Sequence, residues 1–209
     1  MRKRALIIAS LSILAFAGFS TAASATTIKY LTGGTVPSSN PITGQLKAGT
    51  SAVLSSSAGN ITCTTSTFGG SLGTNPAVGP VTGSLTSLTF SNCTDTIPFV
   101  TVSTVTTNVG AGASAKTATA AYVGSASTFA VAGVVATITF TSGSWCTYAP
   151  TTDPATATHD STTSPWNNEY RFNAVPLTRT GGTTICSSTA TWSSTYVAAS
   201  VSVGITIQP

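Results

Sequence analysis

The side chains that could do chemistry are few in this chain. Its 209 residues include one histidine, His159, and four acidic residues: Asp95, Asp153, Asp160 and Glu169. A hydrolase of the Ser-His-Asp type needs a base beside its nucleophile, so it would have to use His159, with Asp153 or Asp160 to orient the ring. Because this histidine lies in a Pro- and Thr-rich stretch, we expect it to be a solvated loop residue. We predict no catalytic residue and no enzyme activity.

The carboxylates also lack the spacing of a glycosidase or a metal site. Glycosidases hold two carboxylates at a fixed separation, whereas Asp153 and Asp160 share one expected loop. Zinc sites need closely spaced cysteines or histidines, and no Cys-x-x-Cys pair is present. The alternating Asp/Asn loop of a calcium motif is also missing. We therefore expect neither a metal nor a cofactor.

Four cysteines point to a disulfide-stapled protein from an oxidising compartment. They are Cys63, Cys93, Cys146 and Cys186, and their spacing alone allows three pairings. We prefer Cys63–Cys93 with Cys146–Cys186, because each of these pairs joins neighbouring strand-like segments. Each disulfide would stabilise the fold by roughly 3–4 kcal/mol.

The N-terminal residues 1–25 have the features of a secretory signal peptide. A basic start, Arg2-Lys3-Arg4, precedes an apolar run that is too short to span a bilayer, and small residues follow it. We expect cleavage after Ala25 and a secreted, extracellular or cell-surface location, with no membrane span in the mature form. The remaining residues, 26–209, are long enough for one domain.

Removal of the signal peptide changes the charge of the chain. Three of its eight basic residues lie in the signal, so five remain against four acidic residues. A nearly neutral domain lacks the clustered basic face that nucleic-acid binding requires. We therefore expect no nucleic-acid partner.

The mature sequence reads as all-β, because Thr and Ser alternate with apolar residues and no helical period is present. We predict a single β-sandwich or flattened barrel of about ten short, mainly antiparallel strands. Eleven segments are candidates: 27–31, 51–55, 60–68, 83–90, 99–106, 117–123, 128–131, 134–140, 169–177, 190–197 and 201–207. Turn-forming Gly, Pro and Asn residues separate them.

Residues 149–168 break this alternation and predict a long polar surface loop. A loop of this length in a compact domain is either functional or merely mobile. We name His159, Asp160, Trp166 and Tyr170, in and beside this loop, as the candidate ligand-binding residues. The other two tryptophans, Trp145 and Trp192, precede a cysteine or alternate with polar residues, so we expect them to pack in the core or against a disulfide.

Some local patterns resemble a known group of proteins. The segments Ala58-Gly59-Asn60-Ile61-Thr62-Cys63-Thr64, Leu88-Thr89-Phe90-Ser91-Asn92-Cys93 and the stretch from Cys186 to Tyr196 resemble uncharacterised small secreted β-rich proteins of actinobacteria. The resemblance covers most of the mature chain. It implies a compartment and an architecture, and it carries no functional residue.

These observations lead to three functional hypotheses. The first is a non-enzymatic extracellular or cell-surface binding module that recognises a protein or a cell-wall polysaccharide. The second is a structural or adhesive surface protein that self-associates, because the expected edge strands lack the lysines that block edge pairing. The third is a secreted hydrolase that uses His159.

Overall fold

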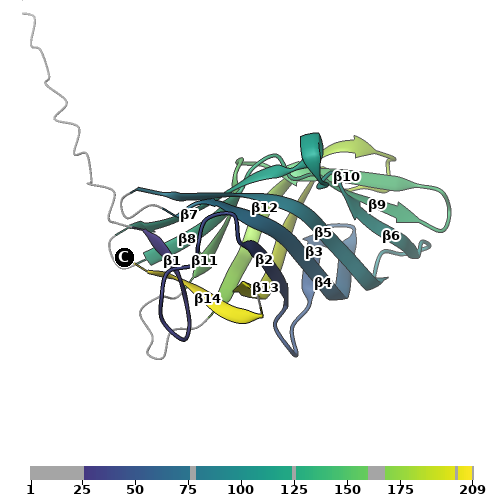
Figure 1. Ribbon diagram of the computed structural model, residues 1–209. Helices are drawn as coiled ribbons and strands as arrows, with labels where there is room; N and C mark the ends of the chain where they lie inside the picture. Colours follow the sequence, from purple (N-terminus) through teal and green to yellow (C-terminus); the bar gives the residue numbers. More distant parts are fainter. Residues whose placement is uncertain (1–25, 76–78, 124–125, 160–167, 201, 209) are drawn as a thin grey trace, which may run out of the picture.

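The computed structural model describes residues 26–75, 79–123, 126–159, 168–200 and 202–208 (Figure 1). The predicted signal peptide lies outside the described residues. No helix within them is long and apolar enough to cross a membrane. They contain one short 3-10 helix, η1 (Gly112–Ser114), and these strands: β1 (Thr27–Tyr30), β2 (Pro41–Leu46), β3 (Ala52–Ser56), β4 (Gly59–Thr74), β5 (Val81–Asp95), β6 (Val102–Thr107), β7 (Lys116–Val123), β8 (Ala126–Val131), β9 (Ala136–Phe140), β10 (Trp145–Pro150), β11 (Ala155–His159), β12 (Glu169–Gly182), β13 (Thr189–Ser200) and β14 (Val203–Gln208).

The strands form one antiparallel sheet that closes on itself over part of its length. Hydrogen-bonded neighbours run from β13 through β2, β4, β5, β7, β8, β11 and β12, and β12 pairs back with β13. We call this circuit the closed ring. Its eight strands are enough to surround a packed interior or one small ligand.

A second circuit uses the other halves of the same long strands. Here β3 replaces β2 between β13 and β4, and β10, β9 and β6 follow β12. Strands β5 and β6 lie side by side, but no backbone ladder joins them in the described part of the chain. We call this circuit the seamed ring and the β5–β6 contact the seam. Figure 1 shows β6, β9 and β10 at one end of the molecule and β7, β8 and β11 at the other.

Four long strands, β4, β5, β12 and β13, run through both rings. Their residues alternate between the interior and the outer surface, as strand geometry requires. In β12 the buried residues Tyr170 and Phe172 precede a register shift, after which Val175 and Leu177 are buried. The bulge thus restores the inward face after two exposed residues.

The prediction of an all-β fold with two disulfides is confirmed, including both preferred pairings, Cys63–Cys93 and Cys146–Cys186. The first disulfide links directly opposed residues of β4 and β5. The second links β10 to the turn between β12 and β13. The strands form one partly ring-closed sheet, which is the flattened-barrel version of the prediction rather than two separate sheets.

The strand predictions were incomplete at three places. Strands β2, β10 and β11 were not predicted, so the described sheet has fourteen strands instead of about ten. The expected loop at 149–168 was wrong for its first half, because β10 extends to Pro150 and β11 occupies Ala155–His159. Residues 160–167 of that loop lie outside the described residues.

Candidate functional site

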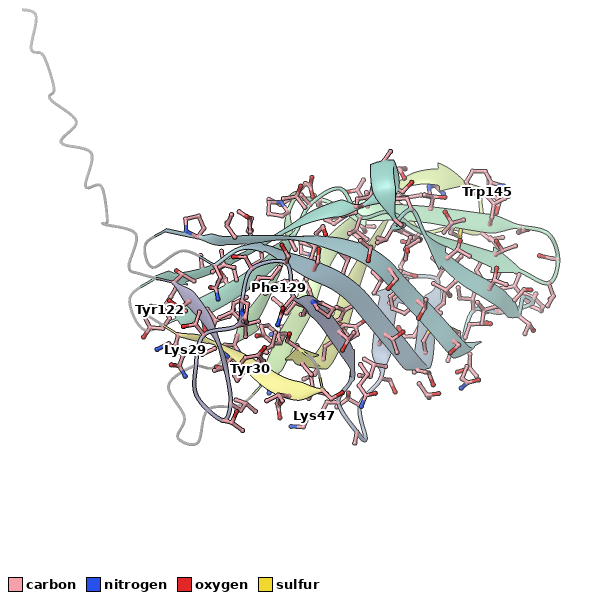
Figure 2. The ribbon with its side chains drawn as sticks, in the orientation of Figure 1. Lys29, Tyr30, Lys47, Tyr122, Phe129 and Trp145 are labelled. Atoms are coloured by element: carbon pink, nitrogen blue, oxygen red, sulfur yellow. A yellow bond between two sulfur atoms is a disulfide. The ribbon has the colours of Figure 1, made fainter. Side chains whose placement is uncertain are left out.

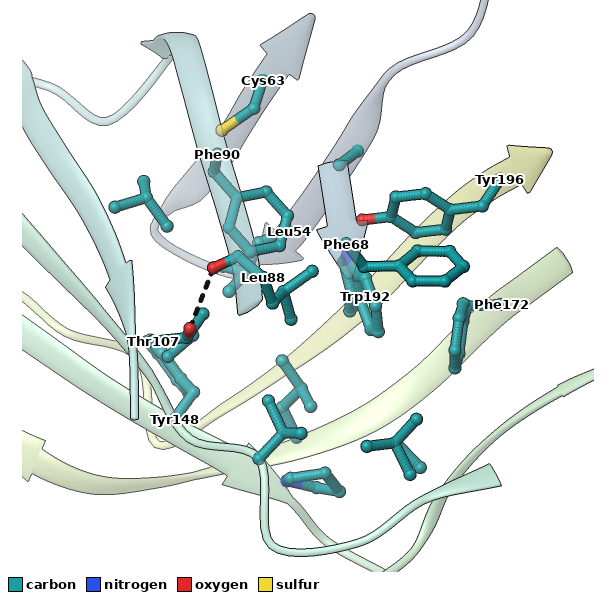
Figure 3. A pocket seen from close by; sticks show the side chains of 18 of the residues that line it. Leu54, Cys63, Phe68, Leu88, Phe90, Thr107, Tyr148, Phe172, Trp192 and Tyr196 are labelled. Atoms are coloured by element: carbon teal, nitrogen blue, oxygen red, sulfur yellow. Dashed lines mark hydrogen bonds between the residues drawn. The ribbon is translucent and has the colours of Figure 1, made fainter. Parts of the chain in front are cut away.

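An apolar cavity of about 100 Å³ lies inside the seamed ring (Figure 3). We call it the main cavity. Among the described residues, no Asp, Glu, Lys, Arg or His lines it. Phe172 and Trp192 stack along its wall with ring centroids 4.5 Å apart, and Phe90 meets Trp192 edge-on. The cavity therefore presents hydrocarbon and aromatic surface to whatever occupies it.

Strand alternation directs the lining side chains inward. On β5, Leu88 and Phe90 face the cavity, while Ser87, Thr89 and Ser91 are exposed on the outer surface. Both inward side chains are only half-buried. The ring is therefore wider here than its own side chains fill.

Every hydroxyl group of the lining residues already has a protein partner. The Tyr148 hydroxyl donates to the Ser187 carbonyl at 2.9 Å, and Tyr196 shares a 2.8 Å hydrogen bond with Ser66. Two further hydroxyls, those of Thr107 and Tyr170, donate to the carbonyls of Leu88 and Ile205. None of these four hydroxyls is therefore free to bind a polar ligand.

The three tyrosines of the wall are uncharged in the physiological range. Burial raises the pKa of Tyr196 to about 12, and the hydrogen bond with Ser66 opposes that rise. Burial raises the pKa of Tyr170 further and also that of Tyr148, where the positive charge of Arg179 opposes the effect. Because desolvation disfavours the phenolate, the cavity is electrically neutral.

The seam forms one side of the main cavity. Leu88 of β5 lies on one side of the seam and Val105 of β6 on the other, and both line the cavity. Two side-chain hydrogen bonds cross it: Thr107 Oγ1 donates to the Leu88 carbonyl at 3.0 Å, and the Val102 N–H donates to the Asp95 carboxylate. Side-chain bonds thus replace a backbone ladder along this edge.

The predicted ligand residue His159 is buried rather than solvated, with 3% of its surface exposed. The Ile207 N–H donates to Nε2 at 3.3 Å, so we assign the ring proton to Nδ1, which lies 2.7 Å from the Glu169 carbonyl. Thr206 Oγ1 also lies 2.9 Å from Nε2. The expectation of a loop histidine was wrong because β11 carries this side chain into the core.

Of the other predicted ligand residues, the structure places only Tyr170. Its ring stacks on His159 with centroids 4.7 Å apart, and only 4% of its surface is exposed. The two residues are therefore neighbours in the core. Asp160 and Trp166 lie outside the described residues.

Two further groups that could do chemistry, Asp153 and Ser71, have structural partners. Asp153 accepts a hydrogen bond from the Gly133 N–H at 2.8 Å. One Gly-x-Ser-x-Gly match, 69–73, lies inside β4 instead of at the strand-to-helix turn where a nucleophile sits. Its serine, Ser71, hydrogen-bonds to the Ser84 hydroxyl at 2.9 Å. Within the described residues, no group of three or more His, Cys, Asp and Glu side chains is placed to hold a metal.

The two described tryptophans differ. Trp192 packs in the aromatic wall, as expected, but Trp145 is 43% exposed at the outer end of β10 (Figure 2). The Trp145 ring lies over Gly181, where a Cβ atom would be 2.9 Å from it. Its expected core position was wrong because the ring packs on the outer face of the sheet.

Comparison of the chain with protein-family models, curated proteins and solved structures finds no match. The main cavity is therefore the feature of the molecule from which a function can be inferred. Sequence patterns placed most of its lining residues on predicted strands but did not reveal the space between those strands.

Proposed function

We propose that this chain is a secreted, non-enzymatic binding module that holds an apolar small molecule in the main cavity. The observation that carries the proposal is an uncharged, aromatic-lined cavity in which every lining hydroxyl is already hydrogen-bonded. Apolar cavities of roughly 150 Å³ lined by Leu, Ile and Phe stay dry and bind benzene or xenon. Small-molecule sites are also typically lined mainly by hydrophobic and aromatic side chains, with a small number of polar groups.

The apolar lining also bears on the partner that we expected from the sequence. A polysaccharide brings many hydroxyl groups, and burying them without hydrogen-bond partners costs free energy. The cavity therefore favours a hydrocarbon-rich ligand over a sugar. A protein partner bound through the outer surface remains a separate prediction.

We assign the seam as the entrance to the cavity. Opening the closed ring would break backbone ladders, whereas the described residues of β5 and β6 are joined across the seam by two side-chain hydrogen bonds, from Thr107 and to Asp95. Backbone amide ladders hold the other strand pairs of both rings. The seam is therefore the side of the cavity that opens at the lowest cost.

The proposal is tested by titrating the secreted protein with N-phenyl-1-naphthylamine, an uncharged apolar fluorophore. We expect saturable binding to one site per chain with a blue-shifted emission. A signal that rises linearly with no saturation, equal to that of an unrelated protein of the same size, would contradict the proposal.

A further inference from the structure

A second, smaller apolar cavity of about 50 Å³ lies inside the closed ring. The same four long strands, β4, β5, β12 and β13, contribute to the walls of both cavities. The two cavities therefore follow one another along these strands. The described residues that line the second cavity are also uncharged.

The partition between the cavities is made of side chains, not of backbone. Phe68, Leu85, Phe129 and Tyr170 line both cavities. The rings of Phe68 and Phe129 stack with centroids 6.4 Å apart, and Phe129 meets Tyr170 edge-on at 5.7 Å. Figure 2 shows Phe129 inside the molecule, between its two ends.

The two phenylalanines have space around them. Both are only half-buried although they lie inside the rings. Gly44 on β2 makes room for one of them, because a Cβ atom there would lie within 2.1 Å of Phe68 Cε1. Because each ring borders both cavities, we expect it to turn aside into that space when a ligand enters.

Resting on the function proposed above, we infer that the ligand carries an unbranched hydrocarbon chain that passes between Phe68 and Phe129. The chain starts in the main cavity and ends in the second. A compact ligand would fill only one of the two cavities, whereas a narrow chain buries methylene groups in both. Each buried methylene contributes about fourfold in affinity. Fatty alcohols, fatty acids and acyl lipids all carry such a chain.

Two ligands with ten carbons each separate a chain from a compact shape: n-decanol and 1-adamantanol. Their affinities are measured by displacement of N-phenyl-1-naphthylamine from the wild type and from Ala120→Leu. Ala120 is buried on β7 and lines the second cavity but not the main cavity. A leucine at this position therefore fills the second cavity. Thr117→Leu, at an exposed position of β7, is the matched control.

We expect Ala120→Leu to weaken n-decanol binding at least tenfold and to leave 1-adamantanol unchanged. Thr117→Leu should match the wild type with both ligands. Equal n-decanol affinity in Ala120→Leu and the wild type would overturn the inference, whereas loss of both ligands and the fluorophore from the wild type would remove the proposed function itself. If Ala120→Leu does not fold, Ala198→Val fills the same cavity from β13. Comparison of decanol with decanoate then separates the alcohol and acid sources.

Discussion

Thr107 Oγ1 donates a 3.0 Å hydrogen bond to the Leu88 carbonyl and so joins β6 to β5 where no backbone ladder does (Figure 3). The bond crosses the seam beside the main cavity, and both residues line that cavity. The larger of the two apolar cavities thus lies beside the strand contact that side-chain hydrogen bonds hold in place of a backbone ladder. This relationship links the fold to the proposed binding of a ligand.

Replacing Thr107 with Val should weaken the seam without changing the shape of the side chain. Loss of one hydrogen bond lowers the free energy of unfolding by about 1 kcal/mol. We also expect faster association of N-phenyl-1-naphthylamine in stopped-flow fluorescence. Thr104→Val, at an exposed position of the same strand, is the control. Equal association rates in the two variants would argue against the seam as the entrance.

The disulfides should carry a large share of the stability. The two bonds close loops with sequence separations of 30 and 40 residues. We expect the double variant Cys63→Ser/Cys93→Ser to lose roughly 3–4 kcal/mol in urea unfolding, and the variant of the other pair to lose a similar amount. Peptide mapping of the secreted protein without reductant checks the pairing. Two free thiols in that protein would refute it.

Alkaline pH should destabilise the protein through its buried tyrosines. Burial raises the pKa of Tyr196 from 10.0 to about 12, so between pH 10 and 12 the unfolded chain loses a proton that the folded chain retains. Stability is therefore constant with respect to this group below pH 10 and falls above it, by up to about 1.4 kcal/mol per pH unit. Urea unfolding at pH 9, 10 and 11 measures the slope. Tyr196→Phe should reduce the slope by that amount, and an unchanged slope would contradict the assignment.

His159 should act on stability. His159→Ala leaves the Glu169 carbonyl and the Ile207 N–H without their ring partner, which costs roughly 1–3 kcal/mol. Thr158→Ala, on the exposed face of the same strand, should change stability by less than about 0.5 kcal/mol. Thermal unfolding of both variants checks the difference. If His159→Ala is as stable as the control, the ring has no structural role. His159 would then again be a candidate for the general base of a hydrolase.

Sequence patterns predicted the fold where apolar residues alternate with Thr or Ser. They failed at β11, whose inward residues Ala155 and Ala157 are weak strand formers, although their alternation with exposed Thr156 and Thr158 is regular. They also ended β4 at residue 68, because Gly69 and Gly70 suggest a turn. In the folded sheet those glycines take part in a bulge opposite β5.

The cavity could not be predicted from the sequence, for a different reason. Alternation identifies which side chains face inward, and that is how Leu88 and Phe90 were placed on a strand. Whether inward side chains fill the interior depends on the circumference of the ring, and therefore on the pairing of β13 with β2, which joins opposite ends of the chain. That pairing is a tertiary contact without a local signal.

Binding of an apolar ligand in the main cavity can be tested with one substitution in its wall. Ala136 of β9 faces the cavity, whereas Thr139 of the same strand points away from it. We predict that Ala136→Leu weakens N-phenyl-1-naphthylamine binding at least tenfold in a fluorescence titration, while Thr139→Leu binds like the wild type and both variants keep the wild-type circular dichroism. Equal affinity in the two variants would place the bound fluorophore outside the cavity and contradict the account.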